Sequence, residues 1–197
     1  LFLQVANKEQ IMQSLCPSSY DNIDILPATM GLATLDRSLG NKGGMGLVLK
    51  KALRVIHDEY DYVLIDCPPV LGVLMVNALA ASDRVIVPVQ TEFLALKGLD
   101  RMMKTLEIMQ GQQPTAFKYT IVPTMFDKRT KASILSYQKL QALYGESVWP
   151  AVIPIDTNFR NASDAQKVPS DYAAKSRGII AYRNLLKYLV NLNTKSK

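Results

Sequence analysis

The chain has little of what usually assigns a function at first sight. Its 197 residues include two cysteines, Cys16 and Cys67, which lie far apart and offer no metal-binding spacing, and one histidine, His57. We therefore expect reduced cytosolic thiols and no cysteine-based metal site. His57 lies in a predicted helix with no cysteine or carboxylate motif around it, so a surface position is the simplest interpretation.

Long apolar runs are also missing. No stretch approaches the roughly 20 apolar residues that a helix needs to span a bilayer, and no signal-peptide pattern is visible. The chain begins with Leu1 and runs at once into helix-like sequence, so we expect a fragment whose amino terminus lies upstream. No repeat, low-complexity tract or long linker divides the sequence, which predicts a single domain over residues 1–197.

What is present suffices for a folded core. Hydrophobic residues make up 48% of the chain, a share that argues against wholesale disorder. The net charge of +6 is mildly basic. It is compatible with an anionic partner but does not indicate nucleic-acid binding by itself.

Short apolar runs alternate with segments in which apolar residues recur every three or four positions. The predicted strands cover residues 23–26, 62–65, 84–89, 119–122 and, as an edge strand interrupted by Pro150, 148–153. The predicted helices cover residues 46–59, 74–81, 93–110, 137–144 and 182–192. This alternation predicts an α/β fold, with a mostly parallel open sheet and helices on both faces.

The most informative stretch surrounds Asp66. The apolar run Tyr62–Ile65 is predicted to form a buried parallel strand that delivers the Asp66 carboxylate to the carboxyl edge of the sheet. Pro68 and Pro69 fix two φ angles and prevent the strand from continuing, so the carboxylate would sit on a stiff exit loop. Many nucleotide-hydrolysing folds place a magnesium-associated carboxylate in this way.

From residue 60 to residue 99 the sequence YDYVLIDCPPVLGVLMVNALAASDRVIVPVQTEFLALKGL resembles the ParA/Soj family. These are deviant Walker-type P-loop ATPases of the MinD/ParA superfamily that partition chromosomes and plasmids. The resemblance continues through TMFDKRT at residues 124–130, VIP at 152–154, FRNAS at 159–163 and KSRG at 175–178. It implies a P-loop NTPase sheet that here lacks its first strands.

The resemblance also implies site residues. Asp66 matches the Walker B aspartate, which helps to hold the water shell of magnesium and is the one catalytic residue we expect. The segment with Pro68, Pro69 and Gly72 matches switch II, which senses the γ-phosphate. Thr124 and Pro154 match two loops that border the adenine. ATP and magnesium are therefore the implied cofactors.

The family's glycine loop, KGGxGK[ST], is not complete in this chain. Residues 42–46 reproduce KGGxG, but Leu47 and Val48 stand where the lysine and the hydroxyl residue should be. No apolar strand precedes this segment, so a glycine turn that feeds a helix is the simpler interpretation. We expect no ATP hydrolysis from these residues alone, and unpaired strand edges that promote aggregation.

Basic residues suggest an anionic partner. Arg160 matches a position that contributes to nonspecific DNA binding in relatives, and Lys128 and Arg129 lie in a loop near the expected nucleotide edge, where they would face DNA or a dimer partner. Lys97, Arg101 and Lys104 share one helix face, and the simplest interpretation is that this face is solvated.

The resemblance implies a cytoplasmic protein, associated with the nucleoid or a cell pole, that forms an ATP-dependent homodimer. It implies nonspecific DNA or scaffold binding and a stimulating partner of the ParB type, but no membrane partner. Within the family, the sequence is most similar to members that position chemotaxis arrays. Two alternatives remain: a non-enzymatic module that docks DNA or a polar landmark, and a MinD-like ATPase that cycles on a membrane.

Overall fold

The computed structural model of the chain describes residues 7–32, 34, 45–67, 72–110 and 118–194. The backbone separates into two compact units, residues 1–83 and 84–197. The prediction of a single domain stays a prediction.

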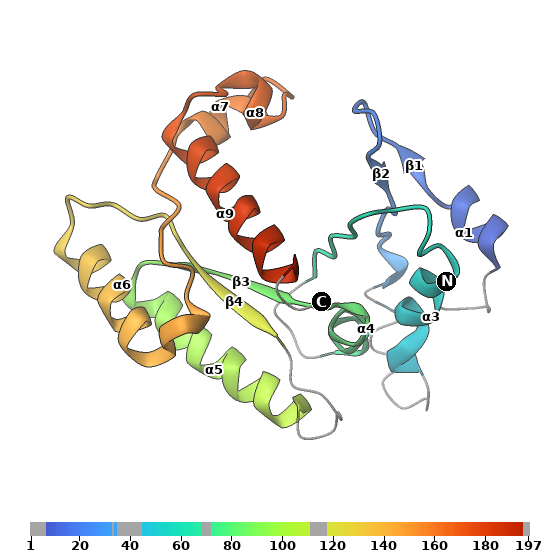
Figure 1. The fold of residues 1–197 in the computed structure, drawn as a ribbon, viewed down its shortest axis with the longest axis horizontal. Helices are drawn as coiled ribbons and strands as arrows, with labels where there is room; N and C mark the ends of the chain where they lie inside the picture. The colour runs from blue at the N-terminus through green and yellow to red at the C-terminus, as the bar shows by residue number, and fades with distance from the viewer. Residues whose placement is uncertain (1–6, 33, 35–44, 68–71, 111–117, 195–197) are drawn as a thin grey trace. The chain divides into compact units, whose positions relative to one another are not determined.

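The first unit is built from short elements (Figure 1). They are α1 (Lys8–Gln13), β1 (Cys16–Pro17), β2 (Asp24–Ile25), η1 (Met45–Leu47), α3 (Val48–Val55) and α4 (Val73–Ala81). A small core joins α1 to α3 and the turn that follows it, with Ile11, Ala52 and Ile56 buried together. The side chain of Asn77 joins α4 to the start of α3, because its Oδ1 accepts a hydrogen bond from the Leu49 amide at 3.0 Å.

The second unit contains a parallel strand pair, β3 (Val85–Gln90) and β4 (Tyr119–Thr124), in continuous register. Its helices are α5 (Phe93–Gln110), α6 (Lys131–Tyr144), η2 (Gly145–Ser147), α7 (Asn158–Asp164), α8 (Pro169–Tyr172) and α9 (Arg177–Thr194). In Figure 1, α5 and α6 lie on one side of the strands and α9 lies on the other.

Strand β4 is the centre of this unit. Its four residues from Thr120 to Pro123 are all buried, which requires cover on both faces of the strand. On one face Val122 packs in a cluster with Trp149, Ile153 and Leu185 of α9. The predicted α/β class with a parallel sheet and helices on both faces is therefore confirmed, as are helices near residues 74–81, 93–110, 137–144 and 182–192.

The prediction of a buried strand at Tyr62–Ile65 is wrong for this structure. These residues form no regular strand, and the Leu64 side chain is 90% exposed. A parallel strand has no hydrogen bonds of its own and forms only beside a neighbour. Among the described residues no strand pairs with this run, so its apolar character alone does not make it a strand.

Two other strand predictions need correction. The run at 23–26 contributes only Asp24–Ile25, which pairs antiparallel with β1 on an exposed hairpin. The run at 148–153 accompanies β4 without a continuous ladder. It makes an isolated parallel bridge between Val148 and Ile121, and the Ile153 amide donates to the Pro123 carbonyl at 2.8 Å.

One helix is shorter than predicted. The segment at 46–59 begins with the 3₁₀ turn η1, and its α-helix stops at Val55. Gly46 lies close to α4, since a Cβ added there would lie 2.9 Å from Cγ1 of Val76. Gly46 lies in the 3₁₀ turn that leads into α3, while residues 41–44 of the predicted glycine turn lie outside the described part of the chain.

The core around β4 predicts how α6 responds to truncation. Leu140 is 0% exposed and Leu143, one turn further along α6, is 62% exposed. We expect Leu140→Ala to destabilise the protein by about 3 kcal/mol and Leu143→Ala to change stability by less than about 0.5 kcal/mol. Urea denaturation of both variants measures this. Equal losses would contradict the placement of α6.

Candidate nucleotide-binding site

Two loops meet at the carboxyl end of β4. The first follows Thr124 and leads into α6, and the second runs from Ile153 to the start of α7. The Phe126 amide donates to the Ile153 carbonyl at 3.0 Å, and the Ile155 amide donates back to the Phe126 carbonyl at 3.2 Å. The bridge between Phe126 and Pro154 continues this pairing. Thr124 and Pro154, which the sequence assigned to the adenine side, thus lie on adjacent, hydrogen-bonded loops.

The first loop is stiffened by an ion pair. The Arg129 guanidinium binds both carboxylate oxygens of Asp127, with Nη2 at 2.7 Å from Oδ2 and Nε at 2.9 Å from Oδ1. This side-chain hydrogen bonding, with the Arg129 amide donating to the same carboxylate, lowers the pKa of Asp127 to about 2. The charge of Arg129 is therefore engaged within its own loop, while Lys128 beside it is exposed.

The second loop is held by Asp156. Its carboxylate accepts hydrogen bonds from the amide of Gly178 at the start of α9, at 2.8 Å, and from the amide and side chain of Asn158. Desolvation raises the pKa of Asp156, but these bonds and one from Ser176 outweigh it, so the pKa falls to about 2. A carboxylate at a helix N-terminus is also favoured by the helix dipole.

Asp66 lies on the surface of the first unit. Its carboxylate is exposed, at the end of the extended run rather than of a strand. Magnesium binds proteins through one or two carboxylates and keeps several water molecules, so an exposed carboxylate fits the water-mediated role expected of Asp66. No cluster of three or more metal-ligating side chains occurs among the described residues, and a site of this kind does not need one.

The other expected phosphate-side residues are only partly visible. Pro68 and Pro69 lie outside the described residues. Gly72 is described and precedes α4 in an extended conformation, with φ −153°. Leu47 and Val48 begin a helix, and neither residue type can supply the ammonium or hydroxyl group of a phosphate loop.

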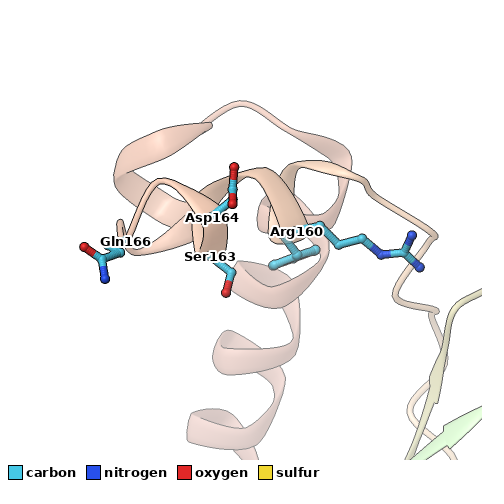
Figure 2. A pocket seen from close by; sticks show the side chains of 5 residues that line it. Arg160, Ser163, Asp164 and Gln166 are labelled. Carbon is cyan, nitrogen blue, oxygen red and sulfur yellow. The ribbon is translucent and has the colours of Figure 1, made fainter.

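Arg160 lies on α7, exposed and beside an open depression that Phe159, Ser163, Asp164 and Gln166 also line. Figure 2 shows the Arg160 side chain reaching away from the helix on one side, with Gln166 on the other. The polar groups therefore do not converge on a common point, which is unlike a small-molecule site. An exposed guanidinium of this kind is suited to a phosphate backbone.

Sequence reasoning missed four residues that shape the loops: Thr91, Met125, Ser133 and Asp156. Asp156 has a local signal, because an Asp side chain readily accepts a hydrogen bond from the backbone two residues further on, as it does here from the Asn158 amide. The positive φ of Met125, 51°, has no sequence signal because methionine rarely adopts it.

No described helix is long and apolar enough to cross a membrane.

Comparisons with known proteins show which sequences this chain is similar to. A family model described as an AAA domain matches residues 1–119. The sporulation initiation inhibitor protein Soj of Bacillus subtilis is 35% identical over 171 residues, which cover 86% of this chain and 68% of that protein. The chromosome partitioning protein ParA of Myxococcus xanthus is 31% identical over 195 residues, covering 98% of this chain and 69% of that protein.

A solved structure is similar to this chain in both fold and sequence. The crystal structure of cobyrinic acid a,c-diamide synthase from Mycobacterium smegmatis with bound ADP and magnesium superimposes with a TM-score of 0.76. It is 30% identical in sequence, and the match covers 94% of this chain and 69% of that one. The match supports the P-loop NTPase type of α/β fold.

The Asp156 interactions predict a pH-dependent contribution to stability. Because its pKa is lowered from 3.8 to about 2, the stabilisation is complete above about pH 4 and is lost as the pH falls towards 2. We expect Asp156→Asn to be less stable than wild type at pH 7, with the difference closing between pH 4 and pH 2. Urea denaturation across this range measures it.

A matched control is Asp164→Asn, which alters an exposed carboxylate on α7 and should leave stability unchanged at pH 7. A difference between wild type and Asp156→Asn that stays constant down to pH 2 would contradict the role given to this carboxylate.

Proposed function

Because the chain belongs to the ParA/Soj family of ATPases, we propose that it is an ATP-binding part of a protein that partitions or positions DNA or polar cargo. The observation that carries this proposal is the similarity to a protein named for chromosome partitioning, which extends over 98% of the chain. The proposal includes an ATP-dependent homodimer and a stimulating partner of the ParB type. A chemotaxis array is the finer candidate for the cargo.

The proposed ATP-binding function assigns a separate task to each set of residues. Asp66 holds the water shell of magnesium, and the segment with Pro68, Pro69 and Gly72 responds to the γ-phosphate. When bound, magnesium neutralises charge on the phosphates during phosphoryl transfer. The loops at Thr124 and Pro154 hold the base, and the hydrogen bonds of Phe126 with Ile153 and Ile155 keep these loops side by side.

The proposed DNA contact is electrostatic. Arg160 and Lys128 present exposed positive charges that neutralise backbone phosphates without reading sequence. Arg129 contributes less, because Asp127 already neutralises it at 2.7 Å. A protein that binds DNA in this way resides in the cytoplasm on the nucleoid, and one that uses a landmark instead resides at a cell pole.

A second candidate function is ATP-dependent amide synthesis. It is favoured by one observation, the name of the 30% identical structure from Mycobacterium smegmatis. The partitioning proposal predicts that DNA stimulates or binds the protein, whereas an amide synthase would require an acid substrate and an amide donor. Hydrolysis of ATP with DNA present and no acid substrate separates the two.

The magnesium role of Asp66 is tested by ATP turnover in the full-length protein. We expect Asp66→Ala to lower turnover by about 100-fold, because a metal-centred charge stabilisation of several kcal/mol is lost. Phosphate release in a malachite-green assay measures this, with Asp83→Ala as a control at another exposed carboxylate. Undiminished turnover by Asp66→Ala would refute the assignment.

The DNA contact is tested by the salt dependence of binding. We expect Arg160→Ala and Lys128→Ala each to reduce the slope of log K against log salt by about one, uniformly across sequences. Arg129→Ala should change the slope less, because its charge is paired. Fluorescence anisotropy with two unrelated duplexes measures the slopes. Anionic liposomes are the parallel arm, and binding to them instead of DNA would favour the membrane-cycling alternative.

A further inference from the structure

The loop after β4 carries a carboxylate among basic residues. Asp127 directly precedes Lys128 and Arg129, whose side chains are both exposed. The pKa of Asp127 is lowered first by the hydrogen bonds from Arg129 and also by the charge of Arg177, at the start of α9. A negative charge at this position opposes the attraction of phosphate to the surrounding cations.

The carboxylate occupies one edge of the Arg129 guanidinium. Nε and Nη2 of Arg129 both donate to it, at 2.9 Å and 2.7 Å. The Arg129 side chain is 81% exposed and that of Asp127 only 17%, so solvent reaches the cation far more than the anion. A phosphate that approaches Arg129 therefore meets a guanidinium whose charge is already balanced at contact distance.

The loop does not need this ion pair for its conformation. The Asp127 amide donates to Ser133 Oγ at 3.1 Å, and the Thr130 amide donates to the Asp127 carbonyl at 3.1 Å. The Asp127 side chain also accepts a hydrogen bond from the Arg129 amide at 3.0 Å, a turn bond that an uncharged side-chain oxygen can make as well. Because ion pairs at a surface add little to stability, stability alone does not account for the charge of Asp127.

The effect of such a pair is largest on a ligand that is recognised by charge. Nonspecific binding to a DNA duplex depends on cations that neutralise phosphates and release counterions. An arginine that is paired with a carboxylate releases fewer counterions, because the net charge at that point is near zero. Exposed cations such as Lys128 and Arg160 then carry the binding, while Arg129 contributes little as long as it stays paired.

We propose that Asp127 limits the affinity for DNA, because its carboxylate withholds the Arg129 guanidinium from the phosphate backbone. This inference rests on the proposed DNA contact and adds the residue that regulates its strength. A phosphate binds Arg129 only by competing with the carboxylate, so DNA dissociates faster than the number of basic residues implies. Fast dissociation suits a protein that positions cargo and has to leave DNA repeatedly.

Removing the negative charge tests the inference. Asp127→Asn keeps an oxygen for the Arg129 amide, so we expect the full-length protein with ATP–Mg²⁺ to bind duplex DNA about threefold to tenfold more tightly at about 50 mM salt. The slope of log K against log salt should become steeper by about one. Asp127→Ser, which also keeps a turn-forming oxygen, should show the same gain. Fluorescence anisotropy with two unrelated duplexes measures both quantities.

A double-mutant cycle assigns the gain to Arg129. In the Arg129→Ala background there is no guanidinium to release, so the gain from Asp127→Asn should shrink to less than about twofold. An equal gain in both backgrounds would mean that the carboxylate repels DNA directly, and it would overturn the withholding of Arg129.

A matched control removes the same charge elsewhere. Glu146 is an exposed carboxylate in η2, which follows the far end of the 14-residue helix α6. A helix of this length spans about 20 Å, beyond the screening length of about 10 Å at 0.1 M salt. We expect Glu146→Gln to change the affinity for DNA by less than about twofold. A gain as large as that of Asp127→Asn would contradict a local effect at Arg129.

The remaining outcomes separate the inference from the proposed function. Wild-type DNA binding without a gain in Asp127→Asn and Asp127→Ser refutes only the inference, and weaker binding would mean that Asp127 instead orients Arg129 towards DNA. If neither wild type nor Asp127→Asn binds DNA, the proposed DNA contact fails as well. Sedimentation velocity with ATP–Mg²⁺ covers the dimer: altered dimerisation with an unchanged salt slope would place the loop against the partner subunit and overturn the inference.

Discussion

The structure of the second unit depends on the hydrogen-bonded surroundings of β4. Parallel strands gain no stability from their own sequence, because every ladder bond is made to a neighbour. β4 has β3 on one edge, in register from Val85–Tyr119 to Gln90–Thr124, and the segment that starts at Val148 on the other. With both faces covered by helices, this strand fixes where its following loop begins. The position of β4 therefore sets the positions of the candidate base-binding loops.

The loops themselves are held by polar groups rather than by apolar packing. An ion pair joins Asp127 to Arg129, the Asp156 carboxylate binds the start of α9, and the buried hydroxyls of Thr91 and Ser133 lie against the turn at Met125. Such contacts are directional, so they can impose a particular backbone conformation where apolar contacts would tolerate several. The same loops carry the two positions that the family resemblance assigns to the adenine.

The elements that the sequence predicted well are those whose signal is local. The β-branched run before Gln90 and the apolar spacing of Leu99, Met103 and Leu106 in α5 depend only on nearby residues, and the structure contains both elements. Asp66 is exposed, but the predicted strand before it does not form, and its magnesium role stays a prediction. Whether Tyr62–Ile65 pairs depends on a neighbouring strand, which its own sequence does not encode.

The loop geometry could not be predicted either, because it depends on contacts between residues that are distant in the sequence. Thr91 and Ser133 are ordinary residues in the sequence, and their significance comes from a contact across 42 positions. Likewise, nothing in the sequence around Met125 distinguishes a methionine with a left-handed backbone from one with an extended backbone. The family resemblance predicts that this loop borders the adenine, and the structure identifies the hydrogen bonds that hold the loop.

The central claim is that the loops at the carboxyl end of β4 form the base side of an ATP site. A crystal structure of the full-length protein with a non-hydrolysable ATP analogue and Mg²⁺ tests it most directly. We expect the adenine ring to lie against the loop after Thr124 and the Pro154 loop. A base bound elsewhere, such as in the depression beside Arg160 on α7, would contradict it.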